Sequence, residues 1–310
     1  MSLNNHPIIC LTGPTAVGKT DIAISLAQIL PCELISVDSA MVYKGMNIGT
    51  AKPSADLLEK NPHHLIDICD PAEVYSVGRF LKDAQSIIEA SILQKRIPLL
   101  VGGTMLYFYA LYKGIAQLPT SQENTNLRQQ LSILDTTSLY QKLKQYDVKA
   151  AARIHSNDRQ RIERALFVYE STGQTLSELQ TVSKIEITHP MIWIIIYPSN
   201  RDELRSKIAT RFHNMLDRGL INEVSQLHQR SDLSLKLPAC RAVGYRQIWE
   251  YLEDKINYTM MKEKSITATC QLAKRQLTWL NKWPHIQYFL SDTPDLINSI
   301  EKYIKKQLDN

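Results

Sequence analysis

Residues 7–20 read PIICLTGPTAVGKT, and this stretch decides the fold. The apolar run from Pro7 to Leu11 is typical of a buried strand, and residues 13–20 match the pattern G-x-x-x-x-G-K-[ST]. Apolar residues then recur at helical spacing: Ile22, Ala23, Leu26, Ala27 and Leu30. A strand, a glycine-rich turn and a helix in this order form a phosphate-binding loop, because backbone N–H groups and the helix N-terminus face the same anion. We therefore predict an α/β domain that binds a pyrophosphate group.

Further apolar runs extend this pattern along the chain. Cys32 to Val37, Ile97 to Val101 and Met191 to Tyr197 each indicate a strand, and helical periodicity separates them, as from Phe80 to Leu93. We predict an α/β fold: a P-loop NTPase-like parallel sheet core flanked by helices. Residues 118–185 have helical spacing and no convincing strand, which predicts an all-helical insertion domain. The core would then comprise residues 1–117 and 186–310, with C-terminal helices.

The composition is that of an ordinary globular protein. The 310 residues are 44% hydrophobic and 22% charged, and the net charge of +5 permits a polyanionic partner without requiring one. The longest apolar run, Ile192 to Tyr197, is too short to cross a bilayer, and no targeting segment is evident, so we expect a cytoplasmic protein without membrane association. The five cysteines are scattered with no Cys-x-x-Cys pair, which favours reduced thiols over disulfides or a zinc site.

The phosphate-binding loop indicates a ligand class but no reaction. Lys19 would bring a point charge to the terminal phosphate, and the Thr20 hydroxyl would be a ligand of Mg²⁺. The whole loop is assigned to diphosphate binding: Gly13, Pro14, Thr15, Ala16, Val17, Gly18, Lys19 and Thr20. No carboxylate follows the strand that ends at Val101, and no Asn-Lys-x-Asp motif for guanine is present. Asp38 follows the second strand, where it is compatible with catalysis or with capping the next segment.

Several blocks of sequence occur together in one known family. They lie in this order along the chain: GPTAVGKT (13–20), DSAMVYKGMNIGTAKP (38–53), PHHLID (62–67), VGGTMLY (101–107), NDRQRIERAL (157–166), RAVGYRQ (241–247) and QLAKRQLTWL (271–280). With these blocks the chain resembles the tRNA dimethylallyltransferases, isopentenyltransferases that modify adenosine 37 beside the anticodon. The resemblance extends from residue 13 to about residue 283.

The resemblance implies an activity and its partners. A dimethylallyl group would pass from dimethylallyl diphosphate to N6 of adenine 37 in tRNAs that read codons beginning with U. The loop would then hold a prenyl diphosphate, whose departure Lys19, backbone N–H groups and Mg²⁺ favour by neutralising its charge. The target base would be flipped out of the anticodon stem-loop into a channel. We expect a monomer.

The resemblance also implies roles at the reacting centre. Asp38 would be the general base that accepts the N6 proton, and Ser39, Ala40 and Met41 would line the pocket for the base. Thr104 would contact the target nucleotide or orient the leaving group, although a turn hydroxyl that satisfies local backbone is the alternative. Arg211 would bind the diphosphate, with an ordinary surface arginine as the alternative.

Basic blocks elsewhere would contact tRNA by the same resemblance. The residues assigned to tRNA are Asp38, Ser39, Ala40, Met41, Thr104, Arg128, Gln160, Arg161, Ile162, Glu163, Arg164, Arg241, Ala242, Val243, Gly244, Tyr245, Arg246, Lys274, Arg275 and Gln276. A charge run is otherwise typical of a solvated face, Tyr245 is equally compatible with core packing, and Trp279 is expected in the core. Relatives carry Arg where Cys270 stands, which would remove one phosphate contact.

Two other functions remain open on the residues. A small-molecule kinase would use the same loop, with Asp38 acting on an acceptor hydroxyl. A non-catalytic tRNA-binding module would need the basic blocks alone.

Overall fold

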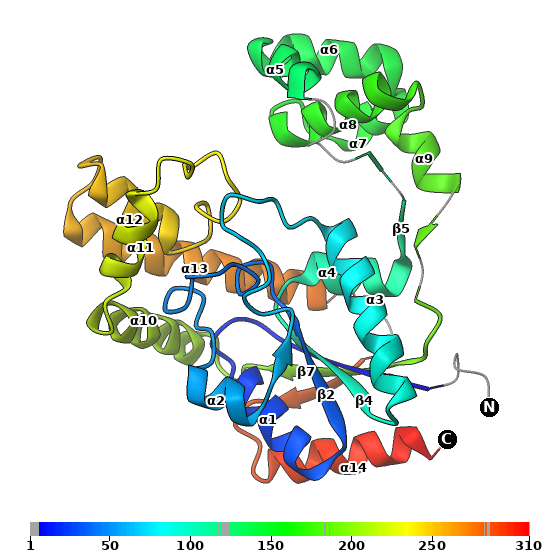
Figure 1. Ribbon diagram of the computed structural model, residues 1–310, viewed down its shortest axis with the longest axis vertical. Helices are drawn as coiled ribbons and strands as arrows, with labels where there is room; N and C mark the ends of the chain where they lie inside the picture. Colours follow the sequence, from blue (N-terminus) through cyan, green and yellow to red (C-terminus); the bar gives the residue numbers. More distant parts are fainter. Residues whose placement is uncertain are drawn as a thin grey trace. The chain divides into compact units, whose positions relative to one another are not determined.

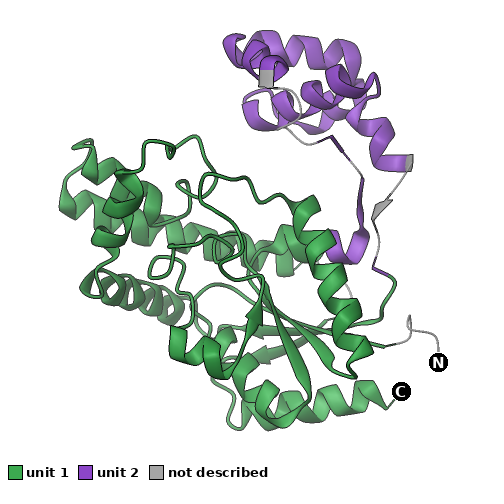
Figure 2. Cartoon of the chain, viewed as in Figure 1, with its two compact units in different colours: residues 1–109, 188–310 green, residues 110–187 purple. Residues whose placement is uncertain are grey.

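The computed structural model describes residues 6–116, 118–119, 125–182, 184–185, 187–281, 283 and 286–309. The chain forms two compact units, shown in Figure 2: Met1–Tyr109 with Thr188–Asn310, and Ala110–Ile187. The sequence pattern placed the corresponding boundaries at residues 117 and 186. Helix α4 (Met105–Lys113) continues across the first boundary, so the chain offers no loop or linker at that point.

The first unit is built on a six-stranded parallel sheet (Figure 1). Its strands, in spatial order, are β3 (His63–His64), β2 (Cys32–Val37), β4 (Ile97–Gly102), β1 (Ile8–Thr12), β7 (Met191–Tyr197) and β8 (Gln287–Leu290). The four inner strands are the ones predicted, because each is a continuous apolar run buried on both faces. The two edge strands escaped prediction: β3 has two polar residues, and β8 is largely exposed.

Helices cover both faces of the sheet. Helices α1 (Lys19–Ile29) and α14 (Leu296–Leu308) share one apolar cluster with Ile9, Leu99 and Ile194. Because strand side chains alternate between faces, the buried Ile8 and Leu100 point to the opposite face, where α3 (Val77–Leu93) packs on β2 and β4. This arrangement confirms the predicted P-loop type of α/β fold.

The rest of this unit is helical, as the spacing predicted. It contains α2 (Ala55–Lys60), α10 (Arg201–Asp217), α11 (Leu220–His228), α12 (Tyr245–Leu252) and α13 (Tyr258–Leu280). Helix α13 packs against α10 and α12, and α11 packs against α12. Leu204 and Ile208 of α10 form a small cluster with Ala273 of α13, against which Ala16 and Cys270 are partly buried. Cys270 therefore takes part in packing.

The second unit is a helical domain with its own core. Its helices are α5 (Thr125–Ile133), α6 (Thr136–Tyr146), α7 (Val148–Arg153), α8 (Arg159–Thr172) and α9 (Leu176–Val182). Asp135, Asp147 and Asp158 cap three of them, each accepting a hydrogen bond from a backbone N–H of the first turn. One short antiparallel ladder joins β5 (Ile115–Ala116) to β6 (Lys184–Ile185), which the sequence pattern did not indicate because each strand has only two residues.

None of the helices in the described ranges combines the length and the apolar character needed to cross a bilayer. The five cysteines form no disulfide.

Candidate active site

Three strand ends lie level at one edge of the sheet. Thr12 of β1 pairs with Gly102 of β4, and Gly102 pairs with Val37 of β2. The residues that follow these strands therefore leave the sheet side by side: the phosphate-binding loop, Asp38, and the turn that leads to Thr104. In open α/β sheets, ligands bind outside the carboxyl ends of the strands, so this edge is the expected place for a site.

The phosphate-binding loop turns directly into α1. Gly18 precedes the helix at φ +88°, a left-handed conformation that favours glycine and explains the second glycine of the motif. Lys19 is the first helical residue, and its ammonium donates a hydrogen bond of 2.7 Å to the carbonyl of Pro14. The Lys19 side chain thus reaches back to the start of the loop.

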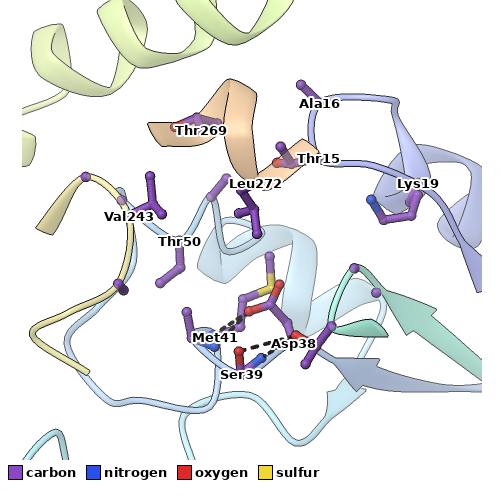
Figure 3. A pocket seen from close by; sticks show the side chains of 18 of the residues that line it. Thr15, Ala16, Lys19, Asp38, Ser39, Met41, Thr50, Val243, Thr269 and Leu272 are labelled. Atoms are coloured by element: carbon purple, nitrogen blue, oxygen red, sulfur yellow. Dashed lines mark hydrogen bonds between the residues drawn. The ribbon is translucent and has the colours of Figure 1, made fainter. Parts of the chain in front are cut away.

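A cavity of about 630 Å³ occupies this edge. Figure 3 shows labelled side chains that reach it from separate segments: Lys19 from α1, Asp38 and Met41 after β2, Val243 before α12, and Leu272 from α13. Lys19 and Asp38 both line this cavity. Its other lining residues from the predicted set are Thr15, Ala16, Gly18, Thr20, Ser39, Ala40, Thr104, Arg211, Arg241, Ala242, Gly244, Tyr245, Arg275 and Gln276.

Two cations are held close together in the cavity. Burial is the main cause that lowers the pKa of Lys19 to about 7, and the neighbouring Arg211 lowers it further, while Asp38 opposes the shift. Burial also lowers the pKa of Arg211, again opposed by Asp38. An anion bound between Lys19 and Arg211 would relieve their repulsion. The charges therefore favour a ligand with several negative oxygens.

Asp38 caps the segment that follows β2, which is one of the two roles considered for it. Its Oδ1 accepts hydrogen bonds from the backbone N–H groups of Ala40, at 2.8 Å, and Met41, at 3.2 Å (Figure 3). Among the described residues, Oδ2 has no hydrogen-bond partner. The cap orients the carboxylate, and the second oxygen is available to a ligand in the cavity.

Thr104 is tied to the same segment. Its Oγ1 accepts a hydrogen bond of 3.0 Å from the Ser39 N–H and donates one of 3.3 Å to the Ser39 hydroxyl. Its own N–H donates to the carbonyl of Val37. Thr104 thus satisfies local backbone, as the alternative proposed, and still lines the cavity beside Asp38.

The segment 241–246 is divided between cavity and protein interior. Arg241 to Tyr245 line the cavity, whereas Arg246 pairs with Glu250 on α12. Tyr245 is buried, and its hydroxyl donates a hydrogen bond of 2.6 Å to Glu223 of α11. Tyr245 therefore contributes to packing as well as to the cavity wall.

Glu223 lies outside every motif and was missed. Its carboxylate accepts hydrogen bonds from the backbone N–H groups of Asn47, Ile48 and Gly49, at 2.8–3.1 Å. These three residues precede Thr50, which lines the cavity. No pattern in the sequence pairs a helix glutamate with a loop more than 170 residues away, as the separations of these bonds show.

Other lining residues were missed for a different reason. Thr269 and Leu272 of α13 and Thr50 carry no charge that would single them out. Trp279, expected in the core, is 39% exposed, and it also lines the cavity. Of these, Thr50, Leu272 and Trp279 lie inside the quoted sequence blocks, and that position was the available signal.

The predicted tRNA residues of the second unit divide by helix face. On α8, Gln160 and Arg161 are exposed, whereas Ile162 is fully buried in the apolar core of this unit. Glu163 pairs with Arg159, and Arg164 donates a hydrogen bond of 2.8 Å to the carbonyl of Pro119. Arg128 is exposed on α5, and in the first unit Lys274 is exposed on α13.

The residues of the cavity fit a magnesium ion that keeps other ligands. Thr20 offers a hydroxyl oxygen, a hard donor of the kind that Mg²⁺ prefers. No group of three or more His, Cys, Asp or Glu in the described part of the chain could hold a metal. Because Mg²⁺ in phosphate sites is usually bound by one or two protein groups together with ligand oxygens, this donor set is sufficient only with a phosphate ligand present.

Known proteins similar to this chain form one group. Residues 41–283 match the model of the family described as IPP transferase. A tRNA dimethylallyltransferase from Coxiella burnetii (strain RSA 331 / Henzerling II) is 48% identical over 307 residues, which are 98% of this chain and 99% of that protein. The crystal structure of a full-length tRNA isopentenylpyrophosphate transferase from Bacillus halodurans superposes with a TM-score of 0.71 at 32% identity, covering 98% and 97% of the two chains. The structure of a eukaryotic dimethylallyltransferase acting on tRNA superposes with a TM-score of 0.83 at 27% identity, covering 97% of this chain and 80% of that one.

Proposed function

The chain belongs to the IPP transferase family, and from this premise we propose that it is a tRNA dimethylallyltransferase. It transfers a dimethylallyl group from dimethylallyl diphosphate to N6 of adenine 37 in tRNAs that read codons beginning with U. The products are N6-isopentenyladenosine and diphosphate. The observation that carries this proposal is the cavity that brings Lys19, Arg211 and Asp38 together at the carboxyl ends of the strands.

The phosphate-binding loop holds the diphosphate end of the donor. The positive charges of Lys19 and Arg211 repel each other, and the negative oxygens of a diphosphate bound between them would offset this repulsion. Both side chains then stabilise the negative charge that develops on the leaving diphosphate as the allylic C–O bond breaks. The same loop serves nucleotide phosphates in other proteins, and it binds any ligand with this phosphate geometry.

The carboxylate end of the cavity receives the adenine. The N6 nitrogen attacks C1 of the dimethylallyl group, the bond from C1 to the diphosphate oxygen breaks, and N6 loses one proton. Asp38 takes that proton through Oδ2, since its Oδ1 is held by Ala40 and Met41. Thr104 and Ser39 stand beside it and position the purine.

The cavity accepts a single extruded nucleotide and not a helix. Its volume of about 630 Å³ lies within the usual range of ligand sites, roughly 300–1,000 Å³. Adenine 37 is therefore flipped from the anticodon loop into it. Mg²⁺, held by Thr20 and diphosphate oxygens, would supply further neutralisation of the leaving group when bound.

Exposed basic residues hold the tRNA on each unit. In the first unit these are Arg241, Lys274 and Arg275, and in the second unit Arg128 and Arg161. They bind phosphates of the anticodon stem-loop, which gives affinity without reading sequence. The enzyme works as a monomer in the cytoplasm.

The deciding experiment incubates the purified protein with dimethylallyl diphosphate, Mg²⁺ and unmodified tRNA, without ATP. Mass analysis of the nucleosides should then give N6-isopentenyladenosine. Replacing adenine 37 by guanine should abolish the product, and Asp38→Asn should greatly slow its formation on tRNA that keeps adenine 37. An absolute requirement for ATP, or phosphorylation of a small acceptor, would instead support the kinase, and tRNA binding with no product would support a binding module.

A further inference from the structure

Gln276 is a buried amide that joins two separate loops of the cavity. It lies on α13, and only 6% of its surface is exposed. Its Oε1 accepts a hydrogen bond of 2.9 Å from the Thr15 N–H, and its Nε2 donates one of 2.8 Å to the carbonyl of Gly103. A single side chain thus bridges the phosphate-binding loop and the turn after β4.

Gly103 shows how closely this bridge is fitted. A Cβ atom built on Gly103 would lie 2.5 Å from Nε2 of Gln276, so no other residue fits there while the amide keeps its place. The glycine and the glutamine therefore depend on each other. Ala16, next to Thr15, also packs against the α10–α13 cluster, so α13 supports the loop by an apolar contact as well.

The opposite face of α13 has a different character. Lys274 is exposed, and Arg275 is exposed at the cavity rim. The helical period therefore separates the block 274–276, which resemblance assigned as a whole to tRNA, into two outward residues and one inward residue. One N–H and one oxygen lone pair of the Gln276 amide are bonded inside the protein, and these two bonds fix the side chain between the loops.

We propose that Gln276 is a positioning residue that holds the phosphate-binding loop ready for diphosphate. This inference rests on the proposed function and gives Gln276 a role toward the diphosphate beside the tRNA contact that the resemblance implies. Without the bridge, the segment around Thr15 samples other arrangements, and the apparent affinity falls by the fraction of molecules that keep the competent one. The effect belongs to the diphosphate and not to the tRNA.

The test measures binding of inorganic pyrophosphate with Mg²⁺ by calorimetry, and binding of unmodified tRNA separately. Gln276→Leu removes both hydrogen bonds and keeps a similar side-chain volume. If the loop then holds the arrangement that binds pyrophosphate about one-tenth of the time, the Kd for pyrophosphate should rise about tenfold. Gln276→Met also removes both hydrogen bonds but keeps the unbranched shape of the side chain, so its Kd should rise as much as that of Gln276→Leu. In both variants the Kd for tRNA should stay within about twofold of wild type.

Two control variants on the same helix separate this role from others. Ser265 is buried and donates a hydrogen bond to the Met261 carbonyl, away from the loop, so Ser265→Ala should lower the melting temperature and leave both Kd values unchanged. Lys274→Ala should weaken tRNA and leave pyrophosphate unchanged.

The outcomes decide between the roles even if the leucine variant folds poorly, because Gln276→Met keeps the length and unbranched shape of the side chain. An unchanged pyrophosphate affinity in both variants would overturn the proposal. So would an equal loss of tRNA affinity, or the same pyrophosphate loss in Ser265→Ala. Failure of the wild type to prenylate tRNA would contradict the proposed function alone, since pyrophosphate binding is measured without the reaction.

Discussion

Binding of a diphosphate should draw a proton onto Lys19. In the free protein, burial and the neighbouring Arg211 lower the pKa of Lys19 to about 7. A diphosphate beside the ammonium favours its charged form and should return the pKa toward its ordinary value of 10.5. Since the pKa rises on binding, protons are taken up whenever the pH lies between these two values.

The size of this uptake follows from the two pKa values. At pH 8, one pH unit above the pKa of the free protein, roughly one-tenth of Lys19 is protonated, so binding takes up roughly nine-tenths of a proton. At pH 6 the side chain is already charged and the uptake is close to zero. By linkage, the affinity should fall as the pH rises above 7, by a factor that approaches roughly ten per pH unit.

Calorimetry in two buffers measures the uptake directly. Pyrophosphate is titrated into the protein at pH 8 in buffers that differ in their heat of ionisation, and the difference in observed enthalpy gives the number of protons. Lys19→Arg is the matched control, because its guanidinium stays charged at this pH and reports only the proton changes of the ligand and the other groups.

The difference between the two proteins is the decisive number. Wild type should take up roughly nine-tenths of a proton more than Lys19→Arg. Equal uptake would refute the reasoning, because Lys19 would then be charged before the ligand arrives. Proton uptake that disappears in Lys19→Met, with pyrophosphate affinity unchanged, would contradict its contact with the diphosphate.

Three further predictions concern other parts of the chain. Asp38→Asn keeps an oxygen that can accept the hydrogen bonds of the Ala40 and Met41 N–H groups, but it cannot take a proton. Single-turnover prenyl transfer should therefore slow by about 10²- to 10⁴-fold, with tRNA affinity retained. A smaller loss of rate would exclude Asp38 as the base. Glu223→Ala leaves three N–H groups without their acceptor and should lower the free energy of unfolding by about 2–4 kcal/mol. Tyr245→Phe removes one hydrogen bond to the same carboxylate and should lower it by about 1 kcal/mol. Equal losses in denaturant titrations would contradict this account. Ile162→Ala should destabilise the helical unit by about 2–5 kcal/mol, because Ile162 lies in its core. Arg161→Ala should leave the stability of this unit unchanged and reduce the salt dependence of tRNA binding by about one phosphate contact. The reverse pattern would show that the faces of α8 are misassigned.

Local chemistry explains what could be predicted. The strand, turn and helix around residues 13–20 could be predicted because such a turn depends only on neighbours in the chain, with a glycine at φ +88° directly before the helix. The inner strands were predicted from apolar runs, since burial on both faces leaves an unbroken signal. The edge strand β8 carries no such signal, because its side chains are largely exposed.

The amino-acid order alone thus determined the fold type and the set of candidate residues. Only the tertiary structure decided which of the candidate residues line the cavity. Within residues 274–276, Lys274 is exposed away from the cavity, Arg275 is exposed and lines it, and Gln276 turns inward to Thr15, 261 residues away in the chain. Glu223 serves a loop that no motif connects to it. Such pairs arise from packing between helices and strand ends, and a contact between residues so far apart leaves no mark in the local pattern of either segment.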